Sequence, residues 1–406
     1  MPALLYVPTR IVAVAIVLSC VLSACGGEGS EADTDGSDAR AETGDFPRPT
    51  KVSETLTFVA VAAGYHHTCA LQVDGHAWCW GSNQYGQLGS SAAMQMCSGG
   101  NLACSATPLQ VDGAVSFVRV SGSIRHTCAI DSNQQAWCWG FGLGGQLGDG
   151  RREDSTLPVL AAGGHAFVEL SGSLGGQATC ALTSAGEAWC WGPNSDGELG
   201  NGTRDVAAEP QLVATTVAFK SISIGDRHAC GVTTTGVAYC WGSNAFGILG
   251  VGDNGSASNL PVLVEGGFVF ASVAAGGEHT CALTAEGQAY CWGLGHLTGS
   301  AGAPNRVSLP RAVETDHRYV AISAGFAHTC ALTADGEIDC WGENLAGQLG
   351  DGTHLDRPLP ARVDSQETFE SIATGGAHTC ALARGGSVWC WGGNPWGGVG
   401  QPVSDP

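Results

Sequence analysis

Residues 378–392 read HTCALARGGSVWCWG, a pattern that is typical of a β-hairpin. Side chains alternate between the two faces of a strand, and the pair Gly385-Gly386 supplies a tight turn. Folding the segment about this turn places Cys380 directly opposite Cys390 and sets small residues opposite tryptophans. Directly opposed strand positions have Cα atoms about 4.5–5.5 Å apart, which a disulfide can bridge. We therefore expect a hairpin that is closed by its own disulfide.

The same phrase recurs seven times along the chain, with a period of about 50 residues. Each copy carries two cysteines ten positions apart: Cys69 and Cys79, Cys128 and Cys138, Cys180 and Cys190, Cys230 and Cys240, Cys281 and Cys291, Cys330 and Cys340, Cys380 and Cys390. In six copies an aromatic residue lies eleven positions before the first cysteine, whereas Phe167 of the third copy lies two positions further away. Short strands and glycine turns at this period are typical of a β-propeller.

A second repeated element, Pro-x-x-Val, ends six residues before each aromatic residue. Its copies are Pro49/Val52, Pro108/Val111, Pro158 with Ala161, Pro210/Val213, Pro261/Val264, Pro310/Val313 and Pro360/Val363. The first copy precedes the first hairpin, and no copy follows the last hairpin. A ring explains this offset, because the N-terminal strand then completes the last blade and no sheet edge is left open. The expected fold is all-β, a seven-bladed propeller over residues 49–403 that is closed by its N-terminal strand, with one disulfide per blade.

The chain is strongly acidic. Its 406 residues include 17 Lys and Arg against 37 Asp and Glu, which gives a formal net charge of −20. A protein that binds nucleic acid needs a basic surface to displace counterions from phosphates. The charge therefore argues against DNA, RNA and anionic lipid surfaces as partners.

The N-terminus has the features of an export signal. An apolar run over residues 11–22 is too short to span a membrane, and it is followed by Leu-Ser-Ala-Cys at 22–25. This resembles the signal of bacterial lipoproteins. The resemblance implies that residues 1–24 are removed and that Cys25 becomes an acylated N-terminus.

Two further features bear on where such a protein would lie. Gly26 and Gly27 are not acidic, so the inner-membrane retention signal of that family is missing, which favours the outer membrane or the cell surface. Residues 25–48 are acidic and nearly free of apolar side chains, so we expect a disordered tether. The expected protein is an extracytoplasmic monomer that contacts the membrane only through its lipid anchor.

The hairpin phrases resemble the regulator of chromosome condensation repeat, whose family fold is a seven-bladed β-propeller. The resemblance covers residues 49–400 and rests on the H-T-x-A-L strand, the W-G-x-N turn and the phrase G-Q-L-G. The fifth repeat departs from it with GLGHLTGS after Trp292, so an irregular loop is expected there. The founding member of the family acts on a nuclear GTPase and binds chromatin, and neither role suits an exported acidic protein. Secreted bacterial relatives that cap other proteins with one propeller face fit better, although a fold does not define a function.

The cysteine count fits complete pairing. Of 18 cysteines, Cys20 leaves with the signal, Cys25 takes lipid, and fourteen form the repeat pairs. Cys97 and Cys104 are expected to form an eighth disulfide. Full pairing is what a disulfide framework in an exported protein predicts.

Zinc is the competing interpretation of these cysteines. In six repeats a histidine lies two residues before the first cysteine, on the same face as both sulfur atoms, so the three side chains could bind zinc. The third repeat has Ala178 instead but keeps its cysteines, which favours disulfides and no metal. The histidines are then expected to form hydrogen bonds inside each blade. No cofactor is expected.

The first repeat contains the longest irregular loop, SSAAMQMCSGGNLACSA at residues 90–106. Met94, Met96 and Asn101 of this loop are the candidate binding residues, because methionine packs adaptably and long loops often carry function. The sequence contains no G-x-S-x-G, P-loop, H-E-x-x-H or dinucleotide motif.

We therefore expect a non-enzymatic scaffold that binds an unidentified protein partner. The alternative is an extracytoplasmic lyase or hydrolase, whose ionisable side chains would converge at one mouth of the propeller channel. A purely structural component of the cell envelope is the third possibility.

Overall fold

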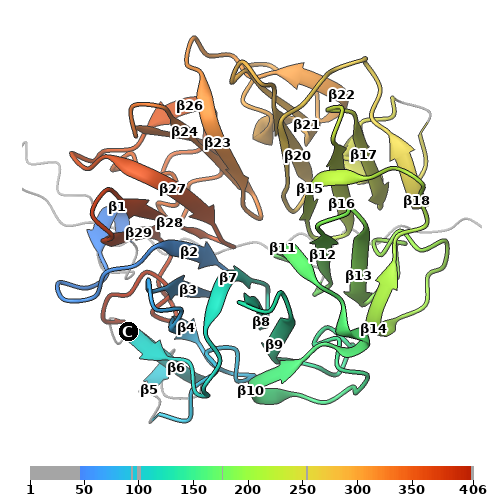
Figure 1. The fold of residues 1–406 in the computed structure, drawn as a ribbon. Coiled ribbons are helices and arrows are strands. Elements are labelled where there is room, and N and C mark those ends of the chain that lie inside the picture. The colour runs from blue at the N-terminus through green and yellow to red at the C-terminus, as the bar shows by residue number, and fades with distance from the viewer. Residues whose placement is uncertain (1–45, 93–94, 98–101, 176, 253–254, 404–406) are drawn as a thin grey trace, which may run out of the picture. The chain divides into compact units, whose positions relative to one another are not determined.

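The computed structural model describes residues 46–403, except for residues 93–94, 98–101, 176 and 253–254. They belong to the second of two units, 1–39 and 40–406, into which contacts divide the chain. Within the described residues the strands form seven antiparallel sheets around a common centre (Figure 1). The expected all-β, seven-bladed propeller is confirmed.

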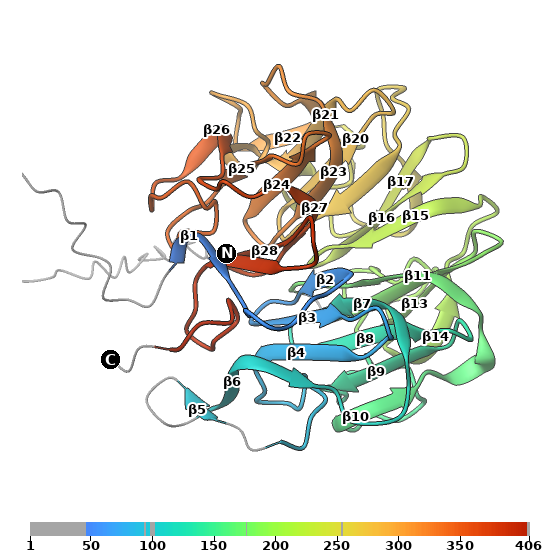
Figure 2. The same ribbon diagram turned by 60° about the vertical axis from the view of Figure 1, so that its left-hand side comes forward.

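The strands of each blade follow one order from the centre outward, as Figure 2 shows from a second direction. The innermost strands are β2 (Ala60–Ala63), β7 (Phe117–Gly122), β11 (Phe167–Gly172), β15 (Phe219–Ile224), β19 (Ser272–Ala275), β23 (Tyr319–Ala324) and β27 (Phe369–Thr374). The second strands are β3 (His67–Leu71), β8 (His126–Asp131), β12 (Thr179–Thr183), β16 (His228–Thr233), β20 (His279–Leu283), β24 (His328–Thr333) and β28 (His378–Ala383). The third strands are β4 (Ala77–Ser82), β9 (Ala136–Gly140), β13 (Ala188–Gly192), β17 (Ala238–Gly242), β21 (Ala289–Leu294), β25 (Ile338–Gly342) and β29 (Val388–Gly392).

The outer strands contain the proline of each Pro-x-x-Val element, and the valine, or Ala161, directly follows the strand. They are β1 (Phe46–Lys51), β6 (Leu102–Gln110), β10 (Ser155–Leu160), β14 (Ala207–Leu212), β18 (Ser258–Leu263), β22 (Arg306–Ala312) and β26 (Arg357–Arg362). The first blade has a fifth strand, β5 (Gln95–Cys97). Short 3-10 turns occur at η1 (Ala162–Gly164), η2 (Ala245–Gly247) and η3 (Gly295–Leu297). The last of these, η3, lies in the loop of the fifth repeat that differs from the repeat pattern.

The N-terminal strand closes the ring. Strand β1 pairs antiparallel with β29 of the last blade, and the sheet order is β1-β29-β28-β27. Val52, directly after β1, is buried with Phe58 and Trp80 of the first blade against the last blade's disulfide. The expected closure is confirmed, and the last blade is built from both ends of the propeller.

The hairpin register matches the sequence pattern. Cys380 pairs with Cys390, Ala381 with Trp389, and Thr379 with Trp391. The glycine after each tryptophan is required for close packing: at Gly392 φ is +103°, and a Cβ there would lie 2.6 Å from the carbonyl oxygen of Ala377. Small residues thus lie opposite large ones across each hairpin, as the alternation predicts.

Every blade contains the disulfide that the ten-residue spacing predicts. The Cα atoms of Cys380 and Cys390 are 4.1 Å apart, close enough for the bond to form across paired strands. The seven bonds join Cys69 to Cys79, Cys128 to Cys138, Cys180 to Cys190, Cys230 to Cys240, Cys281 to Cys291, Cys330 to Cys340, and Cys380 to Cys390. The expectation of one disulfide per blade is therefore confirmed.

The hydrophobic core lies between the blades. Each blade turns its disulfide toward the aromatic residue and the tryptophan of the next blade, as Cys330 and Cys340 do toward Phe369 and Trp391. Seven such layers follow each other around the ring. This explains the alternation in each hairpin, because one strand face carries cysteines for one interface and the other carries tryptophan for the interface on the opposite side.

Candidate functional site

Six buried histidines connect neighbouring blades through their Nε2 atoms. The Nε2 atom of His228 lies 2.8 Å from Oγ1 of Thr280 in the next blade. The same contact recurs at His67/Thr127, His126/Thr179, His279/Thr329, His328/Thr379 and His378/Thr68, and the last of these joins the final blade to the first. The prediction that these histidines bond within their own blade was wrong, because strand alternation turns them toward the neighbouring sheet.

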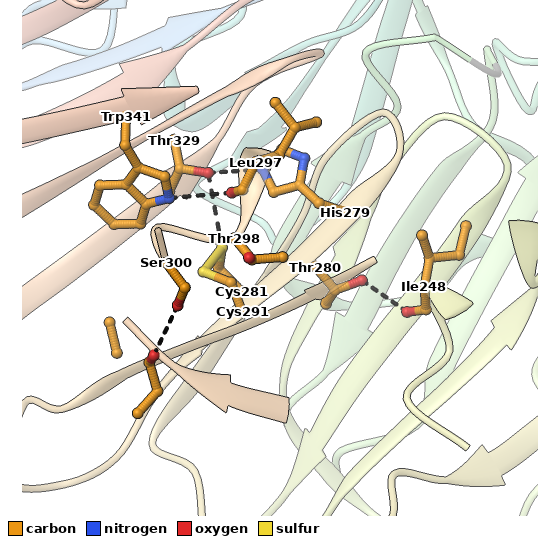
Figure 3. Close-up of a disulfide and its surroundings, with 12 residues drawn as sticks. Ile248, His279, Thr280, Cys281, Cys291, Leu297, Thr298, Ser300, Thr329 and Trp341 are labelled. Atoms are coloured by element: carbon orange, nitrogen blue, oxygen red, sulfur yellow. Dashed lines mark hydrogen bonds between the residues drawn. A yellow bond between two sulfur atoms is a disulfide. The ribbon is translucent and has the colours of Figure 1, made fainter. Parts of the chain in front are cut away.

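Figure 3 shows this contact beside a disulfide. His279 Nε2 lies 2.7 Å from Thr329 Oγ1, and the Sγ atom of Cys281 lies 3.7 Å from the same hydroxyl. Thr280 donates in turn to the carbonyl oxygen of Ile248, which also accepts from Trp292 Nε1. Because the Thr280 hydroxyl donates its proton to Ile248, it accepts from the Nε2–H of His228 in the preceding blade, whose imidazole is neutral with its proton on Nε2.

One interface lacks this contact on both sides. Ala178 replaces the histidine of the third blade, and Ala229 replaces the threonine of the fourth blade. The two losses are complementary, because neither blade then contains a buried polar group without its partner. The two extra residues of the third repeat lie in the loop between β11 and β12, beside Ala178.

The arrangement does not form a metal centre. The two sulfur atoms of each repeat are joined in a disulfide, as those of Cys281 and Cys291 are, and each histidine Nε2 contacts a threonine. In the part of the chain that the structure describes, no three His, Cys, Asp or Glu side chains are grouped so that they could hold a metal ion. The disulfides thus contradict the zinc interpretation.

The candidate loop of the first blade is a disulfide-linked hairpin. Strand β5 pairs with β6, Cys97 and Cys104 are joined, and the Met96 side chain is 56% exposed. Met94, Asn101 and the expected lipidation residue Cys25 lie outside the described residues. Strand β5 lies at the outer edge of its blade, away from the propeller centre (Figure 2).

The central channel is lined by uncharged side chains, mainly glycine, alanine, serine and branched aliphatic residues. It encloses about 250 Å³, and none of the described residues that line it is Asp, Glu, His, Lys or Arg. The hydroxyl groups of four serines in the inner strands accept hydrogen bonds from backbone N–H groups of the next blade. For example, Ser223 Oγ lies 2.9 Å from the backbone nitrogen of Ala275. The lining therefore seals the blades together and offers no acid or base.

Chemically varied side chains gather instead at one mouth of the channel. Here the loops between first and second strands meet the loops between third and outer strands, and we call this surface the loop face. Hydrogen bonds connect the loops around the mouth: the Tyr65 N–H donates to Ser123 O, Phe326 N–H to Gly375 O, and Gly376 N–H to Tyr65 O. Backbone contacts thus hold the mouth in one conformation.

Aromatic rings occupy one part of the loop face. The Tyr65 ring lies 5.3 Å from Phe326 and 4.6 Å from His66, which lies 5.7 Å from Trp396. These residues come from the first, sixth and seventh blades, and Tyr65, His66 and Trp396 line a small apolar cavity. Burial, together with the charge of Arg125, lowers the pKa of His66 to about 4, so this ring is neutral at physiological pH.

Carboxylates occupy the other part. Asp226, Glu278 and Glu343 belong to the fourth, fifth and sixth blades, and burial raises the pKa of Asp226, with the charge of Glu278 adding to the effect. Burial and the charges of Asp226 and Glu343 raise the pKa of Tyr65. The loops of the two parts are in contact, since the Gly277 N–H beside Glu278 donates to Phe326 O at 3.0 Å. Beside them, Asp196 pairs with Arg227 at 2.6 Å.

A buried glutamate supports this region. Glu198 replaces the glutamine of the G-Q-L-G phrase, and its carboxylate accepts the Asp196 N–H at 2.8 Å. Burial raises the pKa of Glu198 to about 7. Sequence reasoning missed both Glu198 and the loop face. A usable signal was present, since the residues just before each histidine differ from repeat to repeat while their flanks stay constant.

No helix among the described residues is both long enough and apolar enough to cross a membrane.

Comparison with known proteins agrees with this architecture. The family model of the RCC1-like domain matches residues 161–406, and models of the regulator of chromosome condensation (RCC1) repeat match residues 58–87 and 74–130. The E3 ubiquitin-protein ligase HERC2 of Mus musculus is 28% identical over 257 residues, which are 59% of this chain but only 5% of the ligase.

Solved structures show the same fold. Human WBSCR16 has a TM-score of 0.73 at 23% identity, and the alignment covers 83% of this chain and 90% of that protein. Yeast RCC1 (Prp20), solved in complex with Kap60, has a TM-score of 0.69 at 21% identity and covers 83% of this chain and 80% of its own. The match over more than half of the sequence, together with the seven-bladed ring, shows that this chain belongs to the RCC1-like domain family.

Proposed function

We propose that this protein is a lipid-anchored, extracytoplasmic scaffold that binds a partner protein through its propeller. The main support is the contrast between repeated and varied positions. The His, Thr, Cys and Trp positions recur around the ring and are buried, whereas the loop face carries a different set of side chains on each blade. A rigid frame that presents unlike residues on one surface suits recognition.

The relatives support binding more than catalysis. The yeast relative is described in complex with another protein, Kap60. The ligase HERC2 is matched over 5% of its own length, so the comparison gives no reason to assign ligase activity to this chain.

Anchoring is tested by replacing Cys25. Radiolabelled palmitate fed to bacterial cells that express the full chain should label the wild type, and the protein should fractionate with membranes. The Cys25→Ala variant should lose both properties, while Cys20→Ala serves as the matched control and should keep them. A soluble, unlabelled wild-type protein would contradict the anchor.

Binding is tested by affinity capture. The anchored protein, crosslinked in cells and purified, should enrich a specific partner that mass spectrometry identifies and that binds again when both proteins are purified. Failure of every enriched protein to bind in the purified system would contradict the proposed function.

The enzymatic alternative has one observation in its favour. Asp226, Glu278 and Tyr65 contribute to the same channel mouth, and the pKa of Asp226 and of Tyr65 are both raised by burial. The alternative predicts release of soluble fragments from cell-envelope polymer by the purified protein, and loss of that release in Asp226→Asn.

A further inference from the structure

The loop face is divided into two chemically different parts. Tyr65, Phe326, His66 and Trp396 form the aromatic part, on the first, sixth and seventh blades. Asp226, Glu278 and Glu343 form the acidic part, on the fourth to sixth blades. The two parts meet at the channel mouth, because the Gly277 N–H, next to Glu278, donates to the carbonyl oxygen of Phe326.

The acidic part is only partly compensated by the protein itself, through the charge of Arg227 near Asp226. Arg227, the nearest cation in sequence, pairs with Asp196 at 2.6 Å, and Glu343 contacts only the imidazole of His296, at 3.7 Å. No ion pair involves Asp226 or Glu278 within the described ranges. Arg125, in the loop between β7 and β8, lies 5.0 Å from the Tyr85 ring centre and 5.7 Å from that of Phe141. The face therefore keeps excess negative charge and already holds one cation against aromatic rings.

The inner strands at the opposite mouth carry charges of both signs. They carry Arg119 and Lys220 as well as Glu169 and Glu370, so the charges of these four side chains cancel, while the turns around this mouth add further carboxylates such as Glu286 and Asp335. Glu169 is moreover engaged, because its Oε1 atom accepts the Ile222 N–H at 2.9 Å. The loop face suits a cationic ligand because, among the described residues, Asp226 and Glu278 form no ion pair and lie at the same mouth as a cluster of aromatic rings.

The loop face is also preorganised. Hydrogen bonds between adjacent loops, such as Gly277 N–H to Phe326 O at 3.0 Å and Asp226 N–H to Gly276 O at 3.1 Å, fix the backbone around the mouth. A surface that is already ordered loses little conformational entropy on binding, which favours recognition of a short segment.

We propose that the loop face binds a protein segment in which lysine or arginine side chains flank an aromatic residue, with the aromatic side chain against Tyr65 and Trp396 and the cations over Asp226 and Glu278. This rests on the proposed function and deepens it by naming the surface and the chemistry of the partner. Cations that lie near aromatic faces and carboxylates gain from both interactions.

The test uses fluorescence anisotropy with a labelled lysine-rich peptide that has one central tryptophan. Wild-type protein should bind it, and added salt should weaken binding because exposed charges are screened. The variant Asp226→Asn/Glu278→Gln should bind about tenfold more weakly, as expected for the loss of two surface charge contacts. A peptide with glutamates in place of the lysines should not bind.

The matched control removes two exposed carboxylates from the turns of the opposite face, in Glu286→Gln/Asp335→Asn. This variant should bind the peptide like the wild type. An equal loss in both double variants would show a general effect of net charge and would overturn the proposal, as would absence of binding by the wild type.

The aromatic part is tested separately with Trp396→Ala and Trp396→Phe. Trp396→Ala should weaken binding of the tryptophan peptide several-fold, Trp396→Phe should restore most of it, and neither should affect a peptide in which alanine replaces the tryptophan. Circular dichroism establishes that the variants are folded. If a captured partner binds the Asp226→Asn/Glu278→Gln variant as tightly as the wild type, the loop face is not the binding surface, although the protein still binds a partner. If no captured protein binds again in the purified system, the proposed function itself is contradicted.

Discussion

The histidine before the first cysteine of a blade shows how a single side chain can join two sheets. In five of the six blades its imidazole packs against a glycine: at Gly325, a Cβ would lie 2.6 Å from Cε1 of His328. Its Nε2 atom contacts a threonine of the next blade, and that hydroxyl often donates onward to a loop carbonyl, as Thr379 does to Gln348 O at 2.9 Å. The repeated residues therefore specify the interfaces between blades as well as the blades.

The first prediction concerns the coupling of this pair. Replacing Thr280 with Ala leaves the His228 Nε2–H buried without an acceptor, so the variant should lose about 1–3 kcal/mol of unfolding free energy. The double variant His228→Ala/Thr280→Ala, which copies the native Ala178/Ala229 interface, should cost less than the sum of its single changes. Urea unfolding of the four proteins measures this, and strictly additive losses would contradict the coupling.

The second prediction concerns acid. Burial lowers the pKa of six histidines, among them His228 and His378, to about 3, below the value of about 6.5 in an unfolded chain. As the pH falls from 6.5 toward 3, these histidines bind protons in the unfolded state but not in the folded state. Each such histidine should therefore cost about 1.4 kcal/mol of stability per pH unit across that window.

Thermal unfolding between neutral pH and pH 4.5 tests this dependence. His378→Gln removes one of the six groups and should show a shallower loss of Tm with falling pH than the wild type. The exposed His76→Gln is the matched control and should follow the wild type. Identical slopes for all three proteins would refute the linkage.

The hairpin is the element on which the fold depends, and its disulfide joins residues that are already neighbours. Cys380 and Cys390 face each other across a local turn in the paired strands β28 and β29. In the chain-entropy model a loop of this size contributes about 3 kcal/mol, but a hairpin that forms without the bond gains less. The sulfur atoms are also buried between blades, so they contribute to packing as well as crosslinking.

The third prediction separates these two contributions. The double variant Cys380→Ala/Cys390→Ala should fold with a Tm several degrees below wild type, because the other six blades keep their bonds. The matched variant Cys97→Ala/Cys104→Ala changes a hairpin at the outer edge of its blade and should shift Tm less. Differential scanning calorimetry measures both, and a larger loss from the edge hairpin would contradict the argument.

At the scale of the whole molecule, closure turns seven similar blades into one cooperative unit. Every interface between neighbours carries a hydrophobic layer, including that between the last and the first blade. Without β1, strand β29 would be an open sheet edge that could pair with another chain.

The fourth prediction tests closure directly. A chain that lacks residues 46–51 should unfold at lower temperature and form dimers or larger species in size-exclusion chromatography. Deletion of residues 26–40, which leaves β1 in place, is the control and should remain monomeric. A stable monomer after loss of β1 would show that the ring does not depend on its N-terminal strand.

Local regularity made the blades predictable. The alternation and the ten-residue spacing define each hairpin and oppose its cysteines, and the offset of the Pro-x-x-Val element predicts ring closure. These features follow from short-range strand geometry, so they can be recognised in the amino-acid sequence.

The contacts between blades could not be predicted from the sequence pattern. The side chain that each histidine meets lies about 50 residues further along the chain, and for His378 it lies 310 residues away at Thr68. The loop face likewise combines Tyr65, Phe326 and Trp396 from loops with no shared pattern. Which irregular loops meet depends on how the closed ring orients its sheets, and only the packing of all seven blades fixes that orientation.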